Sequence, residues 1–432
     1  MSQTTFLNRQ ALYLRPDPAR VLVRPFKPAT EPRDLNATDK TRANHIVDRV
    51  LALDAAAVAT QLADVVDYFQ GRHRNLLEKF EARADEMEGA FATHTAFSIE
   101  QRRLVGAYFM HEYSFEAAAL FNPSIVAHPD QTGAPPGGKR FILSLRAVGE
   151  GHISSLTFRS GVVAADGSVS VDPTARLAST GTVLSRTPGP HGETVDLAFR
   201  TEIDLSERVI FPTTESQSNG IEDARFVPFV DGDTTTFYAT YTAYTGRAIR
   251  SELLETRDFV SFRMSPLTGT AASNKGMGLF PRKINGKYAM IARQDNENLY
   301  LIYSDDLYSW NGGVPILKPQ FPWEFVQIGN CGAPIELDEG WLLLTHGVGP
   351  VRRYAIGAVL LDKADPSKVL ARSREPLVRP EPSAREGYVP NVVYTCGAMR
   401  HDTRIILPYA VSDTYSNFAT LKIAALMDIL RS

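Results

Sequence analysis

Residues 218–227 read Ser-Asn-Gly-Ile-Glu-Asp-Ala-Arg-Phe-Val and lie near the middle of the 432-residue chain. Two adjacent carboxylates, Glu222 and Asp223, follow a glycine turn, and Arg225 comes two residues later, before an apolar run. Neighbouring side chains of a strand point to opposite faces, so we expect Glu222 and Asp223 to face opposite sides. Arg225 would then hold one carboxylate while the other faces a substrate. The alternative is a hairpin start with a surface ion pair, which contributes little to stability.

The chain around and beyond this stretch has the pattern of a β protein. From residue 121 onward, short apolar runs are broken by Gly, Asp, Asn and Pro every eight to twelve residues or so, which is typical of an all-β sandwich, barrel or propeller. The predicted strands are 140–145, 155–158, 236–241, 288–293, 299–303, 341–345, 355–361 and 404–409.

A short internal repeat favours the propeller among these architectures. Residues 256–262 (Thr-Arg-Asp-Phe-Val-Ser-Phe) and 304–310 (Ser-Asp-Asp-Leu-Tyr-Ser-Trp) share an Asp, an apolar residue after it and an aromatic residue four positions past it. The two aspartates, Asp258 and Asp306, stand 48 positions apart, which is close to the length of one four-stranded blade. Roughly 300 residues at ~50 to 60 per blade predict five or six blades, with ligands bound at the mouth of the central channel.

The first hundred or so residues have a helical pattern instead. After an extended apolar piece at 21–26, apolar residues recur at helical spacing within 33–69, within 74–87 and from Ser98 towards residue 120. Ser98 with Gln101 three residues later matches a capping box. We predict that residues 1–117 are a helical N-terminal extension and that 118–432 form the β domain. The extension is expected to brace that domain or to build a contact in a homo-oligomer.

The composition is that of an ordinary globular protein, with 44% hydrophobic and 22% charged residues. A formal net charge of -3 indicates neither a nucleic-acid partner nor an anionic membrane. Cys331 and Cys396 are the only cysteines, too few for a disulfide framework or a structural zinc site, and no residue set has metal-ligand spacing. The N-terminus has no apolar signal-peptide core, and no run approaches the ~20 apolar residues of a membrane span. We expect a cytoplasmic protein with no metal and no cofactor.

Several ordered motifs of the β region can be compared with known families. They are 121–124 (Phe-Asn-Pro-Ser), 143–146 (Leu-Ser-Leu-Arg), 220–225 (Gly-Ile-Glu-Asp-Ala-Arg), 279–288 (Leu-Phe-Pro-Arg-Lys-Ile-Asn-Gly-Lys-Tyr), 323–324, 327–329, 340–341, 345–347, 388–393 (Tyr-Val-Pro-Asn-Val-Val) and 409–414 (Tyr-Ala-Val-Ser-Asp-Thr). Together they resemble glycoside hydrolase family 130, the β-mannoside phosphorylases and mannosidases. The resemblance covers about residues 118–425, and chance agreement of that many ordered pieces is improbable.

The resemblance implies a five-bladed β-propeller that cleaves β-mannosides with inversion. In the family phosphorylases one carboxylic acid assists departure of the leaving group, and inorganic phosphate attacks the anomeric carbon from the opposite face, which gives mannose 1-phosphate. The acid corresponds to Asp223, and its proton is thought to pass through a sugar hydroxyl. Asp413 matches the aspartate that holds the mannosyl unit. The substrate-binding positions implied are Asn122, Arg146, Glu222, Arg225, Tyr388 and Asp413.

The resemblance also implies phosphate ligands at Arg282, Lys283 and His346, with Arg263 as a further candidate. A nucleophile that is already an anion needs no general base, but it does need a cationic cradle. Each position has a structural alternative. Lys283 flanks a turn and could face solvent, and His346 could be a satisfied structural histidine.

One difference from the family pattern leaves hydrolysis as an alternative to phosphorolysis. Gln327 stands where the family phosphorylases commonly carry a lysine before Ile-Gly, so the predicted cradle loses one cation. Arg352 and Arg353 could compensate. The family also contains hydrolases, in which carboxylates activate water, and Glu324 would be the first such candidate. The three hypotheses are a mannoside phosphorylase, a β-mannosidase and a carbohydrate-binding propeller without catalysis. The intact Glu-Asp-x-Arg motif argues against the last.

Overall fold

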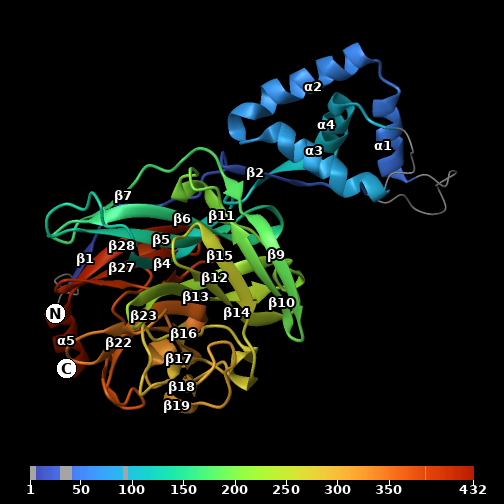
Figure 1. The fold of residues 1–432 in the computed structure, drawn as a ribbon. Helices are drawn as coiled ribbons and strands as arrows, with labels where there is room; N and C mark the ends of the chain where they lie inside the picture. The colour runs from blue at the N-terminus through green and yellow to red at the C-terminus, as the bar shows by residue number, and fades with distance from the viewer. Residues whose placement is uncertain (1–5, 30–40, 91–95, 385) are drawn as a thin grey trace. The chain divides into compact units, whose positions relative to one another are not determined.

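The chain forms two compact units in a computed structural model that describes residues 6–29, 41–90, 96–384 and 386–432. A β unit comprises Met1–Asp17, Glu116–Ala175 and Thr180–Ser432, and a helical unit comprises Pro18–Phe115 with Arg176–Ser179 (Figure 1). The prediction assigned all of residues 1–117 to the helices. The first 17 residues belong to the β unit instead, because strand β1 (Leu7–Arg9) pairs with strand β28 (Tyr415–Lys422).

The described residues of the helical unit form four α-helices and a two-stranded antiparallel sheet. Its elements are β2 (Val21–Pro25), α1 (Arg42–Leu51), α2 (Ala55–Phe69), α3 (Leu76–Met87), α4 (Ile99–Tyr108) and β3 (Met110–Ser114). The predicted capping box is confirmed, since Ser98 Oγ accepts a hydrogen bond from the Gln101 amide and the Gln101 side chain accepts one from the Ser98 amide. The prediction that this helix continues towards residue 120 is wrong, because the chain enters β3 at Met110. Residues 33–40 of the first predicted helical pattern lie outside the described residues.

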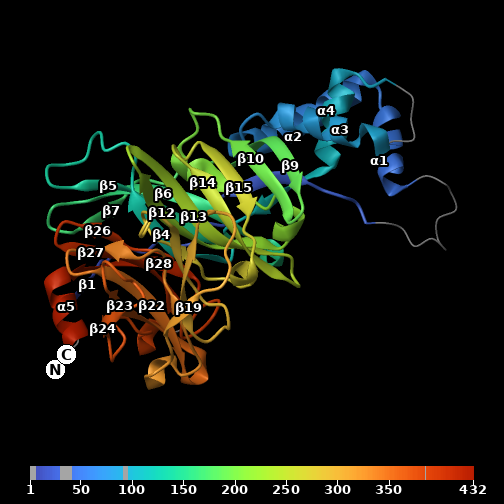
Figure 2. The same ribbon diagram turned by 60° about the horizontal axis from the view of Figure 1, so that its bottom comes forward.

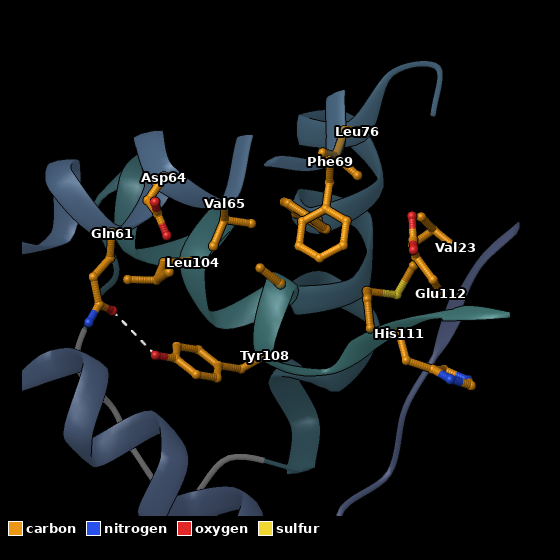
Figure 3. Close-up of a pocket in the computed structure, with 13 residues that line it drawn as sticks. Val23, Gln61, Asp64, Val65, Phe69, Leu76, Leu104, Tyr108, His111 and Glu112 are labelled. Atoms are coloured by element: carbon orange, nitrogen blue, oxygen red, sulfur yellow. Dashed lines mark hydrogen bonds between the residues drawn. The ribbon is translucent and has the colours of Figure 1, made fainter. Parts of the chain in front are cut away.

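A cavity of about 400 Å³ lies within the helical unit, between α2, α3, α4 and β3 (Figure 3). Its wall is mostly apolar, with Phe69 and Leu76 on one side and Leu104 below them. Tyr108 donates a hydrogen bond of 3.3 Å to the side chain of Gln61 at its edge. Helix α2 fully buries two of its fifteen residues, Val58 and Leu62.

The largest sheet of the β unit joins two groups of antiparallel strands. Its strands follow the spatial order β4-β5-β6-β12-β13-β14-β15-β10-β9, and the two groups meet at one parallel pair, Gly220 with Ser154. The bounds are β4 (Ala119–Ala127), β5 (Lys139–Val148), β6 (Ser154–Val163), β9 (Thr182–Gly189), β10 (Gly192–Ala198), β12 (Gly220–Asp231), β13 (Thr234–Tyr244), β14 (Ile249–Thr256) and β15 (Ser261–Pro266), with the short strands β7 (Val169–Val171), β8 (Ser179–Thr180) and β11 (Arg208–Ile210).

Three smaller antiparallel sheets complete the β unit. One contains β16 (Gly278–Leu279), β17 (Tyr288–Ala292), β18 (Leu299–Ser304) and β19 (Val314–Leu317). The next contains β20 (Gln327–Asn330), β21 (Ile335–Glu336), β22 (Trp341–Gly349), β23 (Arg353–Leu361) and β24 (Val369–Arg372). The last contains β25 (Val393–Tyr394), β26 (Met399–His401), β27 (Arg404–Val411), β28 and β1, and a C-terminal helix α5 (Ile423–Arg431) follows it.

The first and last sheets in the sequence are neighbours in space. Strand β4 lies beside β27 and β28 in both views (Figures 1 and 2), and the Leu120 amide donates a hydrogen bond of 2.9 Å to the Thr414 carbonyl. The two ends of the β region therefore meet, although no single sheet closes on itself.

The predicted strands are confirmed, with Arg293 alone lying just past the end of its strand, β17. The predicted repeat corresponds to matching turns. The Asp258 side chain accepts hydrogen bonds of 2.8 Å from the amides of residues 260 and 261, and the Asp306 side chain accepts one of 2.9 Å from the amide of residue 308. The aromatic residue of each copy, Phe262 or Trp310, is buried in a core cluster. No helix within the described ranges is long and apolar enough to cross a membrane.

Candidate active site

A polar cavity of about 180 Å³ is lined by residues of three sheets of the β unit and by Lys275 and Arg293, which lie before β16 and just past β17 of the fourth. Because these sheets follow one another along the chain, side chains up to about 290 positions apart converge on it. The lining residues are Asn122, Arg146, Glu222, Asp223, Lys275, Arg293, Gln327, His346, Arg352, Tyr354, Val392, Tyr394 and Asp413.

A bulge in strand β12 turns both central carboxylates into this cavity. The pairing of β12 with β13 shifts between Glu222 and Arg225, and Asp223 has a left-handed backbone with φ of 53°. The extra residue breaks the strict alternation of side chains. Glu222 and Asp223 therefore both line the cavity, and the prediction that they face opposite sides is wrong.

Two further polar residues use the same left-handed conformation. Strand β4 has a register shift between Phe121 and Ser124, where Asn122 has φ of 49°, and Asp413 after β27 has φ of 47°. Asn and Asp tolerate this region better than other residues that carry a Cβ. The Asn122 amide then donates a hydrogen bond of 2.6 Å to Asp223 Oδ1.

Arg146, on β5, is the cation that holds the two carboxylates. It donates to Glu222 Oε1 at 2.7 Å and to Asp223 Oδ1 at 3.3 Å, and its guanidinium lies 5.0 Å from the ring centre of Phe121. The prediction assigned this role to Arg225. That side chain instead donates to the backbone carbonyl of Asp223 and to the Tyr394 hydroxyl, each at 2.9 Å. Arg225 thus contacts the bulge through the Asp223 backbone carbonyl and does not line the cavity.

The two aspartates of the cavity differ in their affinity for a proton. Burial opposes ionisation of Asp223, but Arg146, Arg225 and Lys275 outweigh it and hold the pKa of Asp223 below its ordinary value. Burial and the charge of Asp223 raise the pKa of Asp413 to about 7, against the opposing effect of Arg146 and Arg352. Near neutral pH the cavity therefore contains an ionised Asp223 and a partly protonated Asp413.

Three cations, Lys275, Arg293 and Arg352, also line the cavity. Lys275 Nζ lies 3.7 Å from Glu222 Oε2. Arg293 is only 8% exposed, and within the described ranges no carboxylate pairs with it and its Nε has no hydrogen-bond partner. Arg352 ends a short 3-10 turn, Pro350–Arg352, where both Val351 and Arg352 have left-handed φ angles.

His346, on β22, lines the cavity as a neutral residue. Burial, together with Arg293 and Arg225, lowers its pKa well below the ordinary value. Its Nε2 lies 3.5 Å from Arg293 Nη1. Because a guanidinium only donates, Nε2 accepts and the ring proton is on Nδ1. The ring stacks on Tyr354, with centres 5.8 Å apart and planes at 17°. His346 therefore forms part of the cavity wall and adds no positive charge to it.

The other predicted phosphate ligands lie away from this cavity. Arg282 forms two hydrogen bonds of 2.9 Å with Glu336 and lines a different cavity. Lys283 pairs with Asp231 at 2.9 Å, and Arg263 pairs with Asp196 at 2.8 Å. Each of these cations already has a carboxylate partner. The structure therefore does not bring Arg282 and Lys283 together with His346, so these three residues do not form one phosphate site as predicted.

Tyr388 and Glu324 also lie outside the lining. Tyr388 is 41% exposed, and its hydroxyl forms a hydrogen bond with the ring of His152. Glu324 is fully buried and accepts hydrogen bonds from the amides of Gln320 and Phe321 and from Arg372, at 2.7, 3.0 and 2.5 Å. It therefore stabilises a turn and has no access to substrate.

Of the residues predicted for the site, Asn122, Arg146, Glu222, Asp223, His346 and Asp413 come together in the cavity. Arg352, considered as a compensating cation, also lines it, whereas Arg353 does not. Lys275, Arg293, Tyr354 and Tyr394 were not predicted. Arg293 carried a signal, since it is an arginine at the end of a predicted buried strand.

Comparison with known proteins agrees with this geometry. The family model described as beta-1,4-mannooligosaccharide phosphorylase matches residues 200–432. A 1,2-beta-oligomannan phosphorylase from a Thermoanaerobacter species is 38% identical over 223 residues, which are 50% of this chain and 73% of that protein. A beta-1,2-mannobiose phosphorylase from Listeria innocua is 32% identical over 226 residues, 50% of this chain and 62% of that protein. A beta-1,4-mannooligosaccharide phosphorylase from Ruminococcus albus is 35% identical over 173 residues, 37% of this chain and 51% of that protein.

Solved structures share the fold. The Listeria innocua beta-1,2-mannobiose phosphorylase superposes with a TM-score of 0.51 at 22% identity, over 73% of this chain and 92% of that chain. A second structure, from work on family members that are hydrolases targeting beta-1,2 mannosidic linkages, has a TM-score of 0.54 at 19% identity, over 72% of this chain and 86% of that chain. Since the family model covers more than half of the chain, this protein belongs to glycoside hydrolase family 130, the carbohydrate-active enzymes that include the β-mannoside phosphorylases.

Proposed function

We propose that this protein is a β-mannoside phosphorylase, which cleaves a β-mannoside with inorganic phosphate and releases mannose 1-phosphate. The observation that carries the proposal is Arg293, a guanidinium buried beside the carboxylates without a carboxylate of its own among the described residues. A buried charge without a partner is destabilising by several kcal/mol. An anionic co-substrate that binds there removes this penalty, and phosphate fits the planar fork of an arginine.

In the proposed function, different lining residues serve the two reactants. Asn122, Arg146 and the carboxyl groups present hydrogen-bonding atoms to a sugar, and Lys275, Arg293 and Arg352 supply three positive charges to an anion. In the proposed reaction Asp223 faces the leaving-group oxygen while phosphate attacks the anomeric carbon from the other face. Because phosphate arrives as an anion, no general base is needed. The reaction uses phosphate as co-substrate and no cofactor.

Lys275, Arg293 and Arg352 supply the positive charge that the family pattern loses at Gln327. Gln327 does line the cavity and is neutral, but the cationic side does not depend on it. The hydrolase alternative needs a carboxylate free to activate water. Glu324 is held in a turn and Glu222 is paired with Arg146, so neither of these two carboxylates is free to activate water.

A five-bladed propeller is the architecture we propose for the β unit. A second cavity, of about 360 Å³, is lined by segments around Ile125, Phe226, Pro281, Ile335 and Met399. The active-site cavity is lined by other residues from the same regions of the chain, in the same order: Asn122, Glu222, Lys275, Gln327 and Tyr394. Five regions of the chain that contribute in order to two cavities support five blades about one axis. The pairing of β1 with β28 supports closure of the ring by the N-terminal strand.

The substrate to test first is a β-1,2-linked mannoside. The Thermoanaerobacter and Listeria relatives with the longest matches act, by name, on β-1,2-linked mannosides, whereas the family description names β-1,4 linkages. We propose an oligomannoside as partner and the cytoplasm as location, and self-association through the helical unit remains part of the proposal.

Removal of the unpaired arginine tests the proposal. In an Arg293→Gln variant we expect the KM for phosphate to rise by about 10- to 100-fold, because a hydrogen bond to a charged group is lost. Initial rates at fixed β-mannobiose and varied phosphate measure this. The matched control is Arg282→Gln, which removes an arginine already paired with Glu336 and should leave the KM for phosphate within about twofold. The reverse result, with Arg282 sensitive and Arg293 indifferent, would remove the phosphate site from this cavity.

A further inference from the structure

Three carboxyl groups line the active-site cavity, and two of them, Glu222 and Asp223, have ion-pair partners. Glu222 and Asp223 both pair with Arg146, at 2.7 and 3.3 Å. Asp413 lines the same cavity, but in the described part of the chain no cation forms an ion pair with its carboxyl group. Its backbone and that of Ser412 adopt the left-handed conformation after β27.

Of three carboxyls that line one cavity, the one without a cationic partner ionises least readily, and here that carboxyl is Asp413. The charged groups with the largest effect on Asp413 are Asp223 and Glu222 from β12, Arg146 from β5 and Arg352 from the 3-10 turn. The remaining titratable groups of the lining are Lys275, Arg293, His346, Tyr354 and Tyr394. Asp223 already accepts hydrogen bonds from Asn122 and Arg146 on one oxygen and is stable as the anion. The raised pKa of Asp413 agrees with a proton that resides there.

We propose that Asp413 is a second catalytic residue, which supplies the proton that leaves with the acceptor. This proposal rests on the proposed cleavage of a β-mannoside. Asp223 and Asp413 then act as a pair that enters the reaction with one proton. Without Asp413, an ionised Asp223 has no proton to give to the glycosidic oxygen.

The proposed step balances in atoms and electrons. The proton moves from the Asp413 carboxyl to Asp223, directly or across a hydroxyl of the bound mannosyl unit, and from Asp223 to the glycosidic oxygen. The bond between that oxygen and the anomeric carbon breaks, and its electron pair stays on the oxygen. A phosphate oxygen donates a lone pair to the anomeric carbon. Asp413 is left as a carboxylate and regains a proton from solvent after the products leave.

A comparison of leaving groups separates proton supply from sugar binding. The Asp413→Asn variant keeps the size of the side chain but cannot give up a proton. With β-mannobiose, whose departing sugar needs a proton, we expect kcat/KM to fall by about 10²- to 10⁴-fold. With 2,4-dinitrophenyl β-mannoside, whose leaving group needs none, we expect a fall of less than about tenfold. Equal losses on the two substrates would overturn the proposal, since a residue that only holds the mannosyl unit affects both alike.

Two controls belong to the same experiment. Asp223→Asn should show the same selective loss, and the double variant should be no worse than either single variant, because both residues act in one proton path. Glu222→Gln removes a carboxylate that pairs with Arg146 and Lys275 and has no place in the proposed proton path, so its losses on the two substrates should be equal. A selective loss in Glu222→Gln that matches that of Asp413→Asn would overturn the assignment to Asp413.

The wild-type enzyme gives a test that does not depend on a variant that folds. The ratio of kcat/KM for β-mannobiose to that for the dinitrophenyl mannoside should fall as pH rises through about 7. A ratio independent of pH between 5 and 9 would overturn the proposal. If the wild type releases free mannose regardless of phosphate, the phosphorolysis proposal fails, but the proton pair remains testable because departure in water also needs the proton.

Discussion

Asp413 lies in surroundings that disfavour the ionised form of its carboxyl group. It is largely buried beside Asp223, and its pKa is raised to about 7, so its ionised form is disfavoured in the folded protein. A carboxyl whose pKa is raised by folding stabilises the folded state least where it must ionise. The stability of the wild type is therefore reduced as pH rises from the unfolded value near 3.8 to about 7.

The Asp413→Asn variant should remove this pH dependence, because an amide does not ionise. At pH 8 we expect its free energy of unfolding to exceed that of the wild type by on the order of 2 to 4 kcal/mol. At pH 4 the two proteins should be nearly equal. Urea unfolding at the two pH values, followed by tryptophan fluorescence, measures the difference. A variant less stable than the wild type at pH 8 would contradict the assigned proton on Asp413.

At the same scale, the sequence predicted which residue types meet in the cavity better than it predicted their partners. The motif around Asp223 and the separate Asn122, Arg146 and Asp413 were all predicted for the site, and they do converge. The choice of cations was less accurate. Arg282 is paired with Glu336, 54 positions away, and nothing in the local sequence around Arg282 indicates that pairing.

The element that positions the chemistry is the start of strand β12. Gly220 begins it with φ of 145°, and a Cβ there would lie 2.2 Å from Ser154 Oγ and 2.9 Å from the Ser154 amide nitrogen. This close approach is the point at which β12 joins β6, two residues before Glu222. The glycine therefore sets where the bulge begins.

A Gly220→Ala substitution should thus disturb both stability and catalysis. Left-handed strain and overpacking together predict a loss of about 2 to 4 kcal/mol, and displacement of Glu222 should lower kcat/KM for β-mannobiose. The matched control is Gly232→Ala in the β12–β13 turn, where φ is 60° and no atom lies within 4 Å of the new Cβ. It should lose about 1 kcal/mol and retain wild-type kinetics. Calorimetry and initial rates test the pair, and equal effects of the two substitutions would contradict this role of Gly220.

Strand existence was predictable from the sequence, but strand irregularity was not. The predicted strands match because their apolar runs are bounded by turn residues, and the Asp258 and Asp306 turns match because the carboxylate side chain caps each turn. The alternation rule then failed at Glu222 and Asp223, where a bulge adds one residue. An Asp or Asn before Ala or Pro in a buried strand is a weak local signal of such a bulge. It becomes informative only when two strands show it side by side.

In the molecule as a whole, the ends of the β region are brought together by pairing that no local pattern reveals. Strand β1 pairs with β28 across more than four hundred positions, and β4 lies beside β27. The prediction assigned residues 1–17 to the helices because helical spacing dominates the first hundred residues. The family resemblance supplied the architecture of the β region, whereas the helical unit and its cavity had no such guide.

The product formed from a β-mannoside tests the central claim most directly. The protein is incubated with β-1,2-mannobiose and with β-1,4-mannobiose, each with and without inorganic phosphate, and the sugars released are identified. We expect mannose 1-phosphate from at least one of the two substrates and turnover only when phosphate is present, because in the proposed reaction phosphate is the nucleophile and binds to Arg293. Free mannose formed at a rate that phosphate does not change would contradict the account.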